Sequence, residues 1–171
     1  MVILRPTRKL GPQLRWTTRL PDSSDTALGD WYVNRIVVNR QPLLLLVSSK
    51  ALLPLVVLAR DVRGLPSRLA GLVATRLGRL GASEAAIEAE TLAMSPVVVS
   101  PTLDRSVLGI MVDFAKSVPY HLENVQIGER TLQLVEDRLA ETPCHASRSF
   151  EQVVFPDRKA PELLRAKWGA G

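Results

Sequence analysis

The chain has 171 residues, of which 46% are hydrophobic and 23% are charged, and its formal net charge is +5. The length suits one domain with a small appendage, and the hydrophobic content excludes wholesale disorder. The single cysteine, Cys144, excludes an internal disulfide and suits a reducing compartment, so we expect a cytoplasmic protein. The basic balance permits an acidic partner, either nucleic acid or an acidic protein.

Basic residues dominate the N-terminal segment. Val2–Leu4 predicts a short first strand, and five basic residues then precede the first acid, Asp22. These residues are Arg5, Arg8, Lys9, Arg15 and Arg19. They predict either an electropositive rim for phosphates, in which Arg8 and Lys9 are candidate binding residues, or a solvated basic surface. The apolar run before Arg5 is too short for the hydrophobic region of a signal peptide.

The core is expected to form from three apolar runs that predict strands. These runs are Trp31–Val38, Leu43–Val47 and Leu55–Ala59, separated by polar turns. The first is β-branched and aromatic, which is typical of a half-buried strand. The second lacks polar alternation, which predicts a strand covered on both faces. Leu44, Leu46 and Val56 should therefore be nearly fully buried.

The second and third runs do not combine into a membrane-spanning helix. Such a span needs about 20 consecutive apolar residues. Polar or helix-breaking residues interrupt the stretch at Ser48, Ser49, Lys50 and Pro54. We therefore expect no membrane association.

Amphipathic periodicity predicts the helices in the rest of the chain. They cover residues 61–80, 83–94, 104–118 and 131–140. A short apolar strand, Val97–Val99, precedes the third helix. Arg68, Arg76 and Arg79 fall on one side of the first helix, which indicates either a basic binding face or the solvent side of an amphipathic helix.

Together these elements predict an α+β fold. A small, mostly antiparallel sheet forms from the N-terminal strand and residues 31–59, and three or four helices pack on one of its faces. Residues 1–140 are expected to form a single domain. Residues 141–171 are expected to form an irregular C-terminal tail that docks on this domain and ends in a helical turn at 161–168.

The sequence contains no motif for binding a metal, a nucleotide or a cofactor. Cys144 and His145 form a lone adjacent pair that matches no zinc spacing. Gly78 and Gly81 lie in and just after a predicted helix, whereas a P-loop or dinucleotide loop needs clustered glycines after a strand. We therefore expect neither a cofactor nor a metal site.

The best polar cluster lies at the start of the predicted helix 104–118. Arg105 stands in its first turn beside Ser106, where an arginine and free backbone N–H groups can bind phosphate. The other interpretation pairs Arg105 with a carboxylate of the protein itself, and we expect this outcome. Asp113 on the same helix and Asn34 in the first long strand are further candidate binding residues, although a buried amide can simply bond to a facing helix.

Three segments occur in a characteristic order: WYVN at Trp31–Asn34, then LLLLVSSKALLPLVV, then DRSVLGIMVDF at Asp104–Phe114. In this order they resemble a bacterial domain family of unknown function, over about residues 1–122. TRKL, Thr7–Leu10, is similar to the opening segment of that family. Val112 stands where the family has asparagine. The resemblance implies a small intracellular bacterial protein and implies no activity.

Two functions from different classes fit these observations. The first is a non-enzymatic binding or regulatory module for an acidic partner, nucleic acid or protein, which a basic surface without an acid–base pair favours. The second is a small enzyme that acts on a phosphate-containing or nucleic-acid substrate through Arg105, Ser106 and Asp113. A pocket that gathers Asn34, Arg105 and Asp113 would favour the enzyme.

Overall fold

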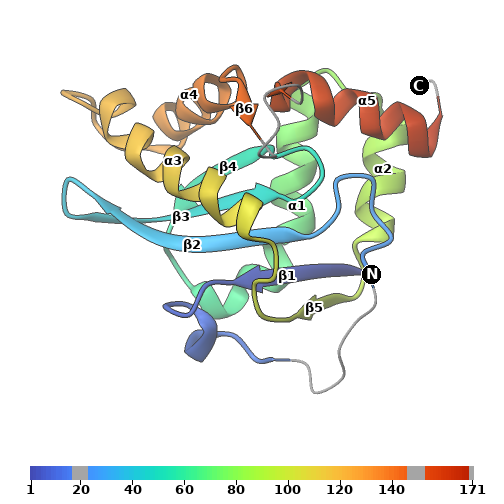
Figure 1. Cartoon of the computed structure of the whole chain (residues 1–171), viewed down its shortest axis with the longest axis horizontal. Coiled ribbons are helices and arrows are strands. Elements are labelled where there is room, and N and C mark those ends of the chain that lie inside the picture. Colours follow the sequence, from blue (N-terminus) through green and yellow to red (C-terminus); the bar gives the residue numbers. More distant parts are fainter. Residues whose placement is uncertain (17–22, 146–152, 170–171) are drawn as a thin grey trace.

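A mixed five-stranded sheet, of strand order β4-β3-β2-β1-β5, forms the centre of the computed structural model, which describes residues 1–16, 23–145 and 153–169 (Figure 1). The strands are β1 (Val2–Pro6), β2 (Trp31–Val38), β3 (Gln41–Ser48), β4 (Pro54–Leu58) and β5 (Val97–Val99). β1 runs parallel to β2 and β5, while β3 runs antiparallel to β2 and β4. The α+β prediction is confirmed, but the sheet is mixed rather than mostly antiparallel.

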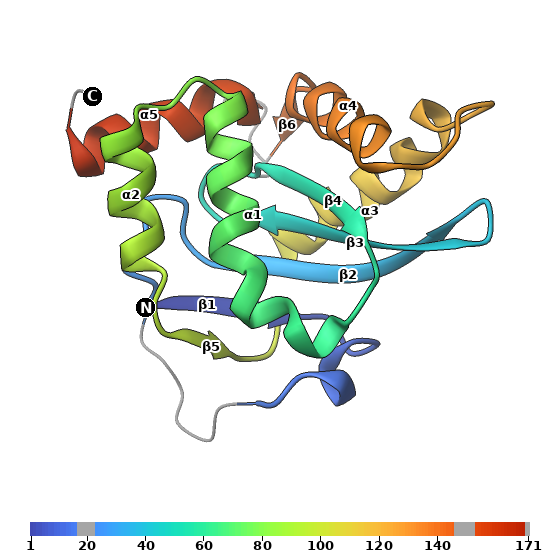
Figure 2. The ribbon, with the colours of Figure 1, turned by 180° about the vertical axis from the view of Figure 1, so that it is seen from behind.

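Two helical layers enclose the sheet. The helices are α1 (Leu65–Arg79), α2 (Glu84–Ala93), α3 (Arg105–His121), α4 (Glu129–Ala140) and α5 (Pro156–Trp168), with short 3-10 turns η1 (Gly11–Gln13) and η2 (Val62–Gly64). α3 lies in front of the sheet in Figure 1, and α1 and α2 lie in front of it in the reverse view of Figure 2. The expectation that the helices share one face is therefore wrong.

The apolar run of β3 explains why both faces are covered. Leu44 and Leu46 belong to the core that includes α1, whereas Leu43 and Leu45 belong to the core that includes α3 and α4. Successive strand residues point to opposite faces, so a strand without polar residues needs cover on both. Leu44 and Leu46 are 0% exposed and Val56 is 2% exposed, which confirms their predicted burial.

The hairpin between β2 and β3 has the tight turn that its polar residues predict. Asn39 and Arg40 both adopt positive φ angles, of 50° and 66°. Two central residues with positive φ form the hairpin turn whose twist matches that of the strands beside it. This turn sets the register, in which Val38 lies opposite Gln41.

The C-terminal tail is more regular than its composition predicts. It contains β6 (Cys144–His145) and β7 (Val153–Val154), which pair with one another, and the 13-residue helix α5, of which 161–168 is only the later part. Pro156 occupies the first turn of α5, where a missing N–H costs nothing. Residues 146–152 of this tail lie outside the described residues. Among the helices that the structure describes, none is long and apolar enough to cross a membrane.

Glu90 on α2 ties three separate segments together. It is 0% exposed, and its carboxylate accepts hydrogen bonds from the N–H groups of Ala27 and Leu28 at 2.8 and 3.0 Å. The indole Nε1 of Trp168 on α5 donates a third bond of 2.7 Å. A buried carboxylate needs such donors, so Glu90 fixes the loop before β2, and the docking of α5, against α2.

Candidate anion-binding cleft

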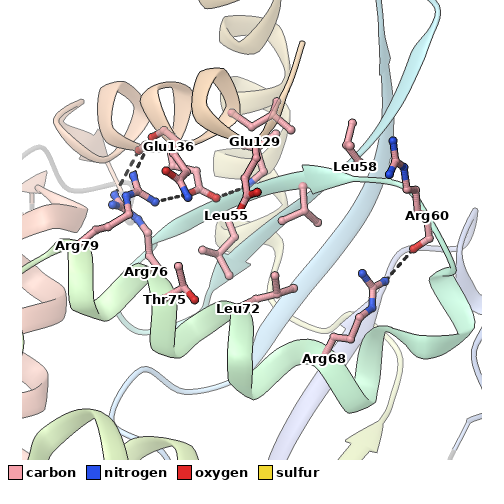
Figure 3. Close-up of a pocket in the computed structure, with 14 residues that line it drawn as sticks. Leu55, Leu58, Arg60, Arg68, Leu72, Thr75, Arg76, Arg79, Glu129 and Glu136 are labelled. Carbon is pink, nitrogen blue, oxygen red and sulfur yellow. Dashed lines mark hydrogen bonds and ion pairs between the residues drawn. The ribbon is translucent and has the colours of Figure 1, made fainter. Parts of the chain in front are cut away.

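A cavity of about 290 Å³ opens between α1, β4 and α4 (Figure 3). β4 lies at one edge of the sheet, so the cavity opens onto a strand edge with one helix on each side. Aliphatic side chains from all three elements line it: Leu55, Val57, Leu58, Leu72 and Leu132. A largely apolar cavity with a few polar groups is the usual form of a small ligand site.

Arginines and carboxylates from α1 and α4 form an ion-pair network at the inner end of the cleft. Arg76 Nη1 donates to Asp137 Oδ1 at 2.7 Å, and Arg79 Nη1 donates to Glu136 Oε1 at 2.7 Å. Arg79 also pairs with Asp137. Arg76 is 1% exposed and Glu136 is 4% exposed. The two positive and two negative charges balance, so this end of the cleft ties α1 to α4 without a net charge.

Burial controls the ionisation of this network. It raises the pKa of the Glu136 carboxyl, although hydrogen bonds from the Val56 N–H and from Arg79 act in the opposite direction. Burial likewise lowers the pKa of Arg76, against the attraction of Glu136 and Asp137. Desolvation of the charged forms therefore outweighs the pairing for both groups. Such a network is expected to hold the fold together rather than to exchange protons with a substrate.

The outer end of the cleft differs because its arginines have no acidic partner. Arg68 Nη2 donates to the backbone carbonyl of Arg60 at 2.8 Å (Figure 3) and to that of Asp61 at 2.9 Å. Neither carbonyl carries a charge that would compensate the guanidinium. Arg60, just after β4, is exposed, and neither arginine forms an ion pair within the described part of the chain. Glu129, at the start of α4, lines the wall above them.

This arrangement suits an anion that carries an aliphatic body. Two arginines line one end of an apolar cavity, and guanidinium is the cation best shaped to receive a carboxylate or a phosphate. In the described ranges, no three side chains of His, Cys, Asp or Glu are placed to hold a metal ion. The arginines and the aliphatic lining offer charge and apolar contact to such an anion.

Arg8 and Lys9 are exposed in the turn that follows β1. Arg5 does not share their environment, because it is buried and its Nε donates to Asp30 Oδ2 at 2.6 Å. Arg15 is exposed after η1, and Arg19 lies outside the described residues. The predicted basic rim thus loses Arg5, whose charge has an internal partner.

Arg105 and Ser106 are both exposed at the start of α3. Asp104 caps this helix by accepting a 2.8 Å hydrogen bond from the N–H of Ser106. Arg105 forms no ion pair with any described carboxylate, so the expectation of an internal partner is wrong. The first turn of α3 projects into solvent here, which explains why the positive charge needs no such partner. Asp113, two turns later, is also exposed.

Asn34 lies in a separate pocket. Its Oδ1 accepts a 2.7 Å hydrogen bond from Thr7 Oγ1, and both residues line this pocket against Leu108, Val112 and Lys116 of α3. The structure describes all six binding residues that were predicted from the sequence, and of these six only Asn34 lines this pocket. The structure therefore does not gather Asn34 with Arg105 and Asp113.

The cleft was only partly visible in the sequence. The periodicity of the first helix places Arg68, Arg76 and Arg79 on one side, and all three line the cleft. The sequence does not reveal that Glu136, 60 residues beyond Arg76, completes the inner network. The adjacent acids of α4 carry no local signal that distinguishes them from solvent-facing residues.

The model of a family described as a domain of unknown function (DUF6933) matches residues 3–159. The chain belongs to this family. The DUF6933 match extends past residue 122, the limit of the resemblance seen in sequence, and includes all three elements of the cleft and the first turn of α5. No curated protein and no solved structure matches the chain.

Proposed function

We propose that this DUF6933 domain is a non-enzymatic binding module for an acidic partner. Arg60 and Arg68, at the outer end of the α1–β4–α4 cleft, would hold the partner. The observation that carries this proposal is their uncompensated charge beside an apolar cavity. An acidic partner would satisfy the charge and cover the apolar surface in one contact.

The other arginines in and near the core support this assignment by contrast. Arg5, Arg76 and Arg79 are each paired with a carboxylate and serve the fold. Arg60 and Arg68 are exposed, and only backbone carbonyls accept hydrogen bonds from Arg68. Their charge is thus available to a partner, and the formal net charge of +5 would draw an acidic molecule toward the protein.

The proposal does not include catalysis through Arg105, Ser106 and Asp113. All three are exposed, and none lines the pocket that holds Asn34. An enzyme that uses them would have to build its site from three exposed side chains on the outer surface of α3. The cleft offers a partly enclosed surface, which favours binding there.

A cytoplasmic location belongs to the same proposal. Cys144 is a free cysteine, and it is buried beneath α3 and α4. Burial and the nearby Asp113 raise the pKa of its thiol to about 11. A free, unreactive thiol is compatible with a reducing compartment.

The proposal is tested by binding two fluorescent acidic probes, a glutamate-rich peptide and single-stranded DNA of equal charge, across a salt series. Arg60→Ala/Arg68→Ala should weaken binding of the preferred probe by about tenfold or more. The control, Arg138→Ala/Arg165→Ala, removes the same charge from exposed sites outside the cleft. Equal losses in both variants would show that binding depends on overall charge and would contradict the proposal.

A further inference from the structure

We infer that the acidic partner is a protein segment that adds as a short strand to the open end of β4. Its carboxylates would meet Arg60 and Arg68, and its aliphatic side chains would fill the cleft. This inference rests on the proposed function and goes further, since it names the class of partner and its mode of binding. Addition of a strand to a sheet edge is a general way for a domain to hold an extended peptide.

The first support is the direction of the backbone groups of β4. In an antiparallel pair, alternate residues direct their N–H groups away from the neighbouring strand. The N–H of Val56 points outward, because it donates to Glu136 Oε2 at 2.8 Å instead of to β3. The same alternation turns the N–H of Leu58 outward. No side chain or backbone carbonyl of the described residues accepts it.

The second support is that the described residues cover only one half of this edge. Leu55 and Val56 are each 2% exposed, because Leu55 packs in the core that includes α1 and Val56 packs in the core that includes α4. Val57, Leu58 and Ala59 are only partly buried, so the edge opens as it approaches Arg60. Proteins usually protect such edges with prolines, charges or covering helices. Here Pro54 and Glu136 protect the first half. In the second half the Leu58 carbonyl accepts a 2.9 Å bond from the Arg60 N–H, which leaves the outward N–H of Leu58 as the free group among the described residues.

The third support is the chemistry of the two walls. An added strand would point alternate side chains toward α1 and toward α4. The α1 wall carries the unpaired Arg68, whereas the α4 wall carries Leu132 beside Leu58. A segment in which acidic and aliphatic residues alternate would therefore match both walls at once.

The same walls disfavour nucleic acid as the partner. Among the described residues, no aromatic side chain lines the cleft, so these residues offer bases no surface for stacking. Glu129 lines the α4 side, where its charge would oppose a continuous phosphate backbone. A segment that presents its carboxylates on one side only avoids this repulsion.

Four fluorescent peptides test the inference by anisotropy. The first alternates glutamate and leucine, and the second has the same composition in two blocks. The third and fourth are the alternating peptide methylated on alternate backbone nitrogens, one in each of the two frames. The alternating peptide should bind about tenfold more tightly than the block peptide. Methylation should weaken binding in one frame only, because only alternate N–H groups of an added strand face β4.

Two substitutions at Leu58 test the edge from the protein side. Leu58→Pro removes the outward N–H, at an edge position that accepts proline, and Leu58→Ala shortens the same side chain but keeps the N–H. The proline variant should lose more affinity for the alternating peptide than the alanine variant does. Urea melts of both variants establish that they fold, and the methylated peptides test the same hydrogen bond without altering the protein.

The outcomes separate this inference from the proposed function. If Arg60→Ala/Arg68→Ala weakens binding but the alternating and block peptides bind equally, the module binds acids and strand addition is wrong. Tighter binding of single-stranded DNA than of either peptide, or β4-mediated dimers in sedimentation, would also overturn the inference. If the arginine variant binds every probe as the wild type does, the proposed function itself fails.

Discussion

Glu136 Oε2 accepts a hydrogen bond of 2.8 Å from the N–H of Val56, so a side chain of α4 occupies the position that a further strand would take at the sheet edge. The other oxygen of the same carboxylate accepts a bond from Arg79. One buried acid thus joins β4 to both helices of the cleft. It also marks where the protected part of the edge ends.

Glu136→Ala should destabilise the fold by about 3–5 kcal/mol, the cost of breaking a buried ion pair by removing one partner. The substitution leaves the Val56 N–H without its acceptor and removes one of the two carboxylates that pair with Arg79. Arg130→Ala, at an exposed position of the same helix, should change the unfolding free energy by less than about 0.5 kcal/mol. Urea melts of the three proteins measure both effects. Similar values for the two variants would mean that Glu136 does not join the elements of the cleft.

The stability that Glu136 contributes should depend on pH. Burial raises the pKa of its carboxyl in the folded state, so the native protein binds more protons than the unfolded chain between the two pKa values. The contribution is therefore fully present below about pH 4.3, the ordinary glutamate value, and declines as the pH rises toward the raised pKa. Relative to Glu136→Gln, which does not titrate, the wild type should lose stability across this window. A wild type that gains stability relative to Glu136→Gln as the pH rises would contradict the assignment.

Much of the sheet can be predicted from local patterns. β2 matches its predicted limits, since its β-branched and aromatic residues favour a strand over a helix. A polar pair marks the turn into β3. The placement of the helices could not be obtained in this way. The periodicity of α3 shows which of its sides is buried but not which face of the sheet it covers. The continuous apolar run of β3 does indicate that helices cover both faces of the sheet, because a strand buried on both sides needs cover on both.

The candidate site was harder to predict because its partners are distant in the sequence. Arg68 and Arg76 share one side of α1, yet one is exposed and the other is buried. Arg76 pairs with Asp137, and its neighbour Arg79 pairs with Glu136. Both acids lie on α4, far from α1 in the sequence. For Arg105 the sequence predicted an internal carboxylate partner, and none of the described carboxylates pairs with it. A charge at an exposed helix start needs no internal partner.

Glu90 and Trp168 should be energetically coupled. Glu90→Ala removes the acceptor of three hydrogen bonds, while Trp168→Phe removes only the indole donor. The alanine variant should therefore be less stable than the phenylalanine variant. A double-mutant cycle in urea should give an interaction energy of about 0.5–3 kcal/mol, as for residues in one hydrogen-bond network. Strict additivity would show that α5 does not dock through this bond.

Arg105→Ala should change stability by less than about 0.5 kcal/mol, because Arg105 is exposed and has no described acidic partner. Arg5→Ala serves as the contrast, since it would leave Asp30 without its buried ion-pair partner and should cost several times more. Thermal melts with and without phosphate add a second readout. A phosphate-dependent stabilisation that is lost in Arg105→Ala would shift the account from the cleft to the start of α3.

The most direct test of the account is to map the binding surface by following backbone amide NMR shifts while a glutamate-rich peptide is added. The account predicts the largest shifts around the cleft, in residues 57–60 of β4 and the turn after it, 68–75 of α1 and 129–133 of α4. Shifts concentrated at residues 8–15 or 105–106 instead, with the cleft unchanged, would contradict it.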